Sequence, residues 1–270
     1  MSTWIHIIGG GLSGLSLASS LAIHKRLPGL VVISEPNLMQ LKNKTFSFWL
    51  TEQEAPLYRP DTQHSAWSLS YGNRQIKHCG KNMNYATRCG ATVLDEALNL
   101  IADHPQIELR EETVSKQPSA HYCFDSRSPS VDSFKIVQSF AGLEIELEHP
   151  HNITVVELMA DLIEVEDGIQ FRYLVPLSAK RLLVEYTRFV ASPANLDELI
   201  ALNRGWASSA FGQYNIIRIE KAHIPMGIEH TNLHWGIPIG ARGGMTRDST
   251  GYGYRTILSW CHTESKRLLR

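Results

Sequence analysis

Residues 4–35 read as a strand, a glycine-rich turn, a helix and a second strand, in that order. The apolar run WIHII leads into Gly9, Gly10 and Gly11, and leucines at helical spacing follow before the second apolar run, LVVIS. Glu35 comes directly after that second run. This succession predicts the first half of a Rossmann-like, dinucleotide-binding α/β fold.

The spacing of the glycines indicates which kind of ligand this fold would bind. Gly9, Gly11 and Gly14 fit the pattern G-x-G-x-x-G, in which the first glycine permits a tight turn, the second lets the backbone approach a pyrophosphate, and the third allows close helix–strand packing. An acid about 20 residues further on, here Glu35, can accept hydrogen bonds from a ribose hydroxyl. The motif fits FAD or NAD(P) equally, and a glycine turn that binds nothing is the alternative.

The composition of the chain argues against several other classes of protein. The 270 residues carry a formal net charge of -1, which argues against nucleic acid as a partner. The four cysteines form no CxxC pair and the twelve histidines show no metal spacing, so we expect reduced thiols in a cytoplasmic protein and no metal site. We expect no signal peptide and no run of roughly 20 apolar residues that could span a bilayer, so that any membrane contact would be peripheral.

Beyond residue 135 the pattern changes to the alternation of half-buried strands, which predicts an antiparallel sheet. One helix interrupts it, with Asn195 as its N-cap and Glu198 three positions later, in the arrangement of a capping box. The last forty residues are glycine-rich again. We therefore predict a discontinuous dinucleotide-binding domain with an inserted β-rich substrate or lid domain. The first comprises residues 1–50, 85–130 and 226–270, and the second comprises 51–84 and 131–225.

Several stretches, in this order, resemble the lycopene cyclase family of flavoproteins. Similarity to family motifs is seen between residues 9 and 146 in GGGLSGLSLA, NKTFSFW, FDSR and QSFAGLEIE. YLVPLSAKRLLVEYT, IPMG and GGMTRDSTGYGY are similar to motifs in the second half. The chain is thereby identified as a shortened member of that family, because the family's further helical stretch after T-G-Y is short here.

The resemblance implies an aromatic hydroxylase-like FAD-binding fold, with FAD kept reduced by NAD(P)H. It implies that a linear polyene end is protonated and closes to a ring without net redox change, as in carotenoid biosynthesis. Gly9, Gly11, Gly14 and Glu35 would then bind the cofactor. The same resemblance adds these residues from the carboxy-terminal segment: Gly243, Gly244, Thr250, Gly251 and Tyr252. Asp125 and Arg127 would either contact the cofactor or form a simple ion pair at a strand end.

Glu185, in the stretch RLLVEYTRF, matches the acidic motif of that family, which implies that it is the catalytic acid. In an apolar cavity a carboxyl group favours its neutral form and can donate a proton near neutral pH. The strand pattern places Leu183, Glu185 and Thr187 on one face. Taken from the pattern alone, Glu185 could equally be a solvated strand residue.

Two other readings stay open at this point. A redox flavoprotein, such as a monooxygenase or prenyl reductase, would have the same fold and would make Glu185 incidental. A non-catalytic flavin-binding homologue would bind FAD and release no product. The terminal KRLLR is expected to be a solvated tail, and the sequence does not predict an oligomeric state.

Overall fold

The computed structural model describes residues 2–130, 134–228 and 235–270, and the chain divides into two compact units. Each unit is assembled from segments that are distant in sequence. Unit 1 comprises Met1–Lys44, Cys89–Phe134 and Pro225–Arg270, and unit 2 comprises Thr45–Arg88 and Lys135–Ile224.

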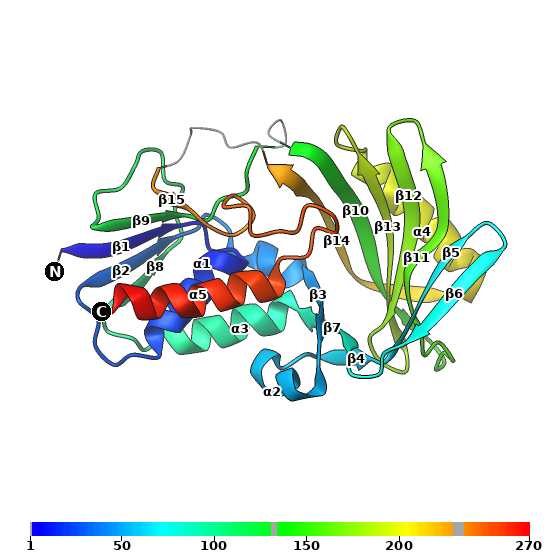
Figure 1. Cartoon of the computed structure of the whole chain (residues 1–270), viewed down its shortest axis with the longest axis horizontal. Coiled ribbons are helices and arrows are strands. Elements are labelled where there is room, and N and C mark those ends of the chain that lie inside the picture. Colours follow the sequence, from blue (N-terminus) through cyan, green and yellow to red (C-terminus); the bar gives the residue numbers. More distant parts are fainter. Residues whose placement is uncertain (1, 131–133, 229–234) are drawn as a thin grey trace. The chain divides into compact units, whose positions relative to one another are not determined.

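The sheet of unit 1 is parallel, with the strand order β15-β9-β1-β2-β8 (Figure 1). The central strand β1 is buried: Ile5, Ile7 and Ile8 are at most 2% exposed. Continuous burial of this kind is expected for a parallel strand that other elements cover on both faces. The strands are β1 Thr3–Ile8, β2 Leu30–Ser34, β8 Ile107–Arg110, β9 Tyr122–Asp125 and β15 Ile237–Pro238.

In the described part of unit 1, three α-helices accompany this sheet: α1 Leu12–Ala22, α3 Gly90–Ile101 and α5 Tyr254–Leu268, with a 3-10 turn η1 at Leu38–Asn43. Both α5 and α3, labelled in Figure 1, pack against α1. Because neighbours surround it, α1 buries Leu15, Leu17 and Leu21 completely.

The carboxy-terminal residues correct one expectation. They form the end of α5, in which Ile257, Cys261 and Leu268 are buried, and the Cys261 thiol donates a hydrogen bond to the Ser13 carbonyl at 3.5 Å. Within the terminal KRLLR, Lys266, Arg267 and Arg270 are exposed as predicted, whereas Leu268 is buried in the last turn of the helix. None of the helices in the described part of the chain is both long and apolar enough to cross a membrane.

Unit 2 contains, among the described residues, a seven-stranded sheet in the order β14-β10-β13-β12-β11-β5-β6 and a three-stranded sheet in the order β3-β7-β4. The pairs formed by β10, β13, β12 and β11 are antiparallel, as predicted, whereas β11 and β5 run parallel. The strands of the large sheet are β5 Ala66–Tyr71, β6 Arg74–Cys79, β10 Phe134–Leu147, β11 Val156–Val165, β12 Gly168–Pro176, β13 Arg181–Val190 and β14 Tyr214–Ile228. The remaining elements are β3 Thr45–Leu50, η2 Glu52–Glu54, α2 Ala55–Tyr58, β4 Thr62–His64, β7 Asn84–Cys89 and α4 Leu196–Phe211.

The two faces of β13 differ in chemistry. Leu182 and Val184 belong to an apolar cluster that includes Ala207 of α4. Successive side chains of a strand point to opposite faces. Glu185 and Thr187 therefore lie on the face of β13 opposite to the one that packs against α4. The predicted grouping of Leu183, Glu185 and Thr187 on one face is therefore consistent with the packing.

The cap of α4 follows the prediction only in part. The Asn195 side chain accepts a hydrogen bond from the Asp197 backbone N–H at 3.0 Å. The Glu198 carboxylate, which a capping box would direct to the backbone of the cap, instead accepts from Arg188 at 3.3 Å. Arg188 lies on β13, so this contact joins the helix to the sheet.

Candidate functional site

The turn after β1 requires glycine at two positions and leaves space at a third. Gly9 has φ +102°, a left-handed conformation that favours glycine. A Cβ on Gly14 would stand 2.0 Å from the Gly9 carbonyl oxygen, so the first turn of α1 can approach the preceding loop only without a side chain. A Cβ on Gly11 would meet nothing within 4 Å. The turn therefore leaves an open approach to the backbone at Gly11.

The start of α1 has the properties of an anion site. Gly11 is the N-cap and makes no side-chain capping hydrogen bond. Backbone N–H groups at a helix N-terminus lack partners within the helix, and the helix dipole favours negative charge there. Pyrophosphate is the group that such a glycine-capped terminus binds in dinucleotide folds.

A cavity of about 400 Å³ opens beside this turn, within unit 1. Gly9, Gly11 and Glu35 line it, as does Arg127. The Glu35 carboxylate accepts hydrogen bonds from the backbone N–H of Gly10 at 2.7 Å and of Asn37 at 2.8 Å. A carboxylate offers about four acceptor positions, so these two bonds fix its orientation and leave capacity for a ribose hydroxyl.

Asp125, in contrast, does not line this cavity; it is fully buried at the end of β9. It accepts hydrogen bonds from Arg127 at 2.6 and 2.9 Å and lies 3.4 Å from the Arg242 guanidinium. Burial raises the pKa of Asp125, but the hydrogen bonds and charges of the two arginines outweigh this effect and lower it overall. The strand-end ion pair is thus present, and it presents Arg127 to the cavity.

The carboxy-terminal glycine segment packs near α1 but does not line the cavity. A Cβ on Gly240 would stand 2.2 Å from the Ser13 hydroxyl, in the first turn of α1. Gly243 and Gly244 follow in the tight turn that begins there. Thr250, Gly251 and Tyr252 belong to a second turn, closed by backbone hydrogen bonds to Arg247. The structure brings the first of these turns to the helix start and leaves the second apart from the cavity.

Some cavity residues were missed by the sequence reasoning. Ser34 and Glu112 line the cavity, and the Ser34 hydroxyl donates to Glu112 at 2.7 Å and contacts the buried His6 ring at 2.8 Å. Burial, and next the charge of Arg110, lower the pKa of His6. The available signal was position, because Ser34 ends one parallel strand and ligands bind at the carboxyl ends of such strands.

Glu185 lies in unit 2 and is 7% exposed. The Thr187 hydroxyl donates a hydrogen bond to its carboxylate at 2.8 Å. In the sheet register Glu185 is opposite Gly142 of β10 and Tyr173 of β12. The sequence alternative of a solvated strand glutamate does not describe this position, because the side chain is buried.

The neighbouring strand supplies aromatic surroundings. Tyr173 is itself buried, and its hydroxyl forms hydrogen bonds of 2.8 Å with Tyr85 and with Ser47. These bonds hold its ring in place beside the β13 position that carries Glu185. The structure therefore places the Glu185 carboxyl group in a buried position beside a fixed aromatic ring.

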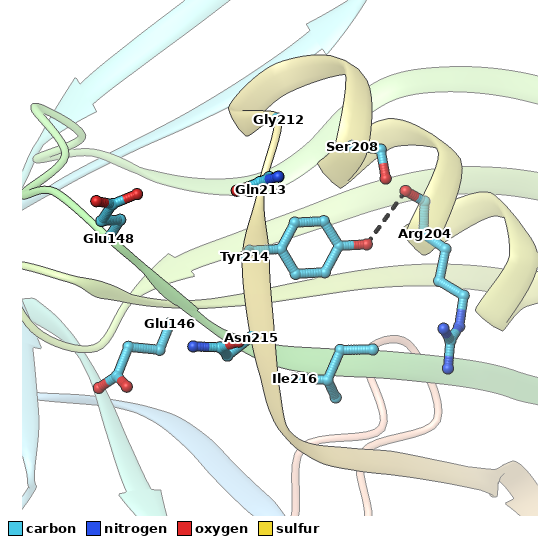
Figure 2. Close-up of a pocket in the computed structure, with 9 residues that line it drawn as sticks. All are labelled: Glu146, Glu148, Arg204, Ser208, Gly212, Gln213, Tyr214, Asn215 and Ile216. Atoms are coloured by element: carbon cyan, nitrogen blue, oxygen red, sulfur yellow. Dashed lines mark hydrogen bonds between the residues drawn. The ribbon is translucent and has the colours of Figure 1, made fainter.

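A second cavity, of about 630 Å³, lies within unit 2 at the junction of α4 with β14. Figure 2 shows that Tyr214 points toward Arg204, whose carbonyl oxygen accepts a hydrogen bond from the Tyr214 hydroxyl at 3.4 Å. Glu146, near the end of β10, and Glu148, just after that strand, also line this cavity. None of the residues predicted to act in a site lines this cavity, and Glu146 is bound by Arg181 at 3.1 Å. It is a polar surface hollow.

Comparison with known proteins agrees with these features. The family model described as "Lycopene cyclase protein" matches residues 5–267. A lycopene beta-cyclase of Paracoccus sp. (strain N81106 / MBIC 01143) is 31% identical over 124 residues, and one of Pantoea ananas is 29% identical over 128 residues. In both cases the match covers 43% of this chain and 32% of the relative, so it spans about a third of the relatives' length.

Solved flavoenzyme structures share the fold at low identity. A geranylgeranyl bacteriochlorophyll reductase-like protein from Thermoplasma acidophilum has a TM-score of 0.67 at 11% identity, over 99% of this chain and 78% of that one. The p-nitrophenol 4-monooxygenase PnpA of Pseudomonas putida DLL-E4 has a TM-score of 0.69 at 12% identity, over 99% and 80%. These likenesses confirm the predicted Rossmann-like FAD/NAD(P)-binding fold with an inserted sheet domain.

Proposed function

Because the chain belongs to the lycopene cyclase family, we propose that it is a FAD-dependent cyclase of lycopene or a related polyene. The reaction converts a linear ψ-end to a β-ionone ring, as an isomerisation in carotenoid biosynthesis. The observation that carries the proposal is Glu185, a buried carboxyl group at the position of the family's acidic motif.

The residues of unit 1 fit FAD. Gly11 leaves space at the uncapped start of α1 for a pyrophosphate, and Glu35 is oriented for a ribose hydroxyl. Arg127 lines the same cavity and can compensate phosphate charge. When bound in its reduced form, kept so by NAD(P)H, FAD supplies negative charge that stabilises a carbocation without transferring hydride.

Glu185 performs the proton transfer in this proposal. Its carboxylic acid gives a proton to a terminal double bond, and the electron pair of a neighbouring alkene closes the ring on the resulting cation. Loss of a proton from another ring carbon completes the isomerisation, so no electrons are gained or lost. Thr187 orients the carboxyl group through its 2.8 Å hydrogen bond, and burial keeps water from capturing the cation as an alcohol.

The substitution Glu185→Gln tests this role. We expect the variant to fold and bind FAD as the parent does, because glutamine has the same shape, and to form no cyclic product in cells that accumulate lycopene. Glu198→Gln, which alters an exposed glutamate of the same unit, is the matched control and should cyclise normally. The pigments are analysed by chromatography and mass spectrometry. A cyclic product from the Glu185→Gln variant would contradict the proposed mechanism.

The shared fold also suits a redox flavoprotein, since a reductase-like protein and a monooxygenase have this fold. Turnover distinguishes the two functions. A cyclase releases an isomer and consumes no stoichiometric NAD(P)H, whereas a reductase or monooxygenase consumes one equivalent for each product. A non-catalytic homologue would bind FAD and leave every polyene unchanged.

Access to a water-insoluble substrate suggests peripheral contact with a membrane, and the β5–β6 hairpin supports this part of the proposal. Tyr71 and Ile76 on this hairpin are each 59% exposed, with the exposed cations Arg74 and Lys77 beside them. Exposed apolar and basic side chains together favour an anionic lipid surface. Flotation with anionic vesicles should carry the protein upward and zwitterionic vesicles should do so less. If a variant that combines Ile76→Ser and Lys77→Glu floats as well as the parent protein, the hairpin does not bind the vesicles.

A further inference from the structure

A series of hydrogen bonds runs from the interior of unit 1 to the wall of its cavity. Nε2 of His6, on β1, lies 2.8 Å from Oγ of Ser34, at the end of β2, and the Ser34 hydroxyl donates to Oε1 of Glu112 at 2.7 Å. His6 and Ser34 are buried, whereas Glu112 is exposed and lines the cavity. The His6–Ser34–Glu112 network therefore ends in a carboxylate that a ligand can reach.

The direction of these hydrogen bonds follows from the protons available. A serine hydroxyl has one proton, and that of Ser34 goes to the Glu112 carboxylate. The Ser34 oxygen must then accept from the ring nitrogen of His6, so both hydrogen bonds point toward Glu112. A carboxylate offers about four acceptor positions, and Ser34 occupies one of them. Glu112 can thus accept a further hydrogen bond from a ligand in the cavity.

The strand order places Glu112 at a definite distance along the ligand. Neighbouring strands follow the order β1-β2-β8. The glycine turn follows β1, Glu35 follows β2, and Glu112 comes two residues after the end of β8. The backbone N–H of Glu35 donates to the Arg110 carbonyl at 3.0 Å, so the ends of β2 and β8 are joined. A dinucleotide with its pyrophosphate at the glycine turn and its ribose at Glu35 has its base as the next group, toward Glu112.

The lining of the cavity near the two carboxylates suits a flat base. Pro36 and Leu38 follow Glu35 in the chain, Val114 follows Glu112, and all three of these apolar residues line the cavity. In ligand pockets apolar side chains supply most of the contact, and a few polar groups fix specificity. A carboxylate only accepts hydrogen bonds. The 6-amino group of adenine is a donor, whereas a 6-oxo group in the same place is an acceptor.

We propose that Glu112 is a specificity-determining residue that accepts a hydrogen bond from the 6-amino group of adenine in FAD, and that Ser34 positions its carboxylate. The inference rests on the FAD binding of the proposed function, and it names the group by which this site distinguishes one dinucleotide from another. His6 supports Ser34, because its ring N–H occupies the serine oxygen and leaves the hydroxyl proton for Glu112.

Binding of FAD and of its hypoxanthine analogue tests this proposal without a polyene. The analogue carries a 6-oxo group and a ring N–H in place of the 6-amino group, so it presents an acceptor to the Glu112 carboxylate. Equilibrium dialysis with the full chain, freed of flavin, should give a Kd for FAD that is about 10-fold or more below that of the analogue, as expected for one hydrogen bond to a charged group. Equal Kd values would overturn the proposal.

Three variants locate the preference within the network. Glu112→Gln should abolish it, because a carboxamide can accept from an amino group or donate to an oxo group. Glu111→Gln, which alters the exposed neighbouring glutamate outside the described cavity lining, is the matched control and should keep it. Ser34→Ala should reduce the preference, since the carboxylate is no longer held. A preference that survives in Glu112→Gln, or equal weakening of both flavins in Ser34→Ala, would overturn the assigned roles.

The same titrations separate this inference from the proposed function. If FAD is preferred over the analogue but no polyene is cyclised, only the proposed reaction fails. If both flavins bind with equal Kd and lycopene is cyclised, only the inference about Glu112 fails. If neither flavin binds, both are wrong.

Discussion

Adding one methyl group at Gly11 should separate cofactor binding from folding. Gly11 has an ordinary φ of −75°, and a Cβ there would meet nothing within 4 Å. Gly11→Ala should therefore leave the apo-protein as stable as the parent or more stable by about 0.4–1 kcal/mol, because alanine restricts the unfolded chain. The methyl group would occupy space that a pyrophosphate needs. Loss of one hydrogen bond to a charged group costs about 1.5–3 kcal/mol, or roughly a 10- to 150-fold weaker Kd for FAD.

Gly14→Ala is the matched contrast for this experiment. Its Cβ would stand 2.0 Å from the Gly9 carbonyl oxygen, so the backbone must move, at a cost of about 1–3 kcal/mol in unfolding free energy. FAD titration by flavin fluorescence and thermal unfolding of the apo-protein give the two quantities. We expect Gly11→Ala to lose affinity alone and Gly14→Ala to lose both. Parent-like FAD affinity in Gly11→Ala would refute the assignment of the cavity.

Two further predictions test the packing around the sheet of unit 1. Asp125→Asn should cost about 3–5 kcal/mol in unfolding free energy, because Arg127 and Arg242 would lose their buried counter-charge. Since the pKa of Asp125 is lowered, the parent should lose this contribution as the pH falls below about 4, and the variant should show a flatter acid limb in denaturant titrations. Burial raises the pKa of Cys123 to about 11 and that of Cys261 to about 12, whereas Cys79 is exposed. A thiol reagent at about pH 8 should therefore label Cys79 in the native protein and the buried pair only after unfolding, as read by peptide mass.

The sequence predicted those parts of the fold that local pattern controls. The first strand, the glycine turn and α1 were predicted because each has a short-range physical signature, and the strands β10, β12 and β13 because alternation defines them. The burial of Leu268 in the tail was not predicted, for the opposite reason. Ile257, Cys261 and Leu268 recur at helical spacing, but the polar residues between them hide the face that α1 covers. Only the partner helix reveals that this face is buried.

For the candidate site too, contacts between residues close in the sequence could be predicted, and contacts between distant residues could not. Gly9, Gly11 and Glu35 follow one another within a motif, so their shared cavity could be predicted. The position of Tyr173 opposite Glu185 could not, because it arises from the pairing of β12 with β13. The hydrogen bonds of Tyr173 to Tyr85 and Ser47 join residues still more distant in the sequence, and no local pattern indicates them.

Cyclisation in deuterated water tests the central claim most directly. Purified protein with reduced FAD, supplied with lycopene in vesicles, should give a cyclic product that gains one deuterium for each ring, because the proton added comes from an acid in exchange with solvent while a different hydrogen leaves. A product without deuterium, or one whose mass shows added hydrogen or oxygen together with NAD(P)H consumption, would contradict proton transfer from Glu185.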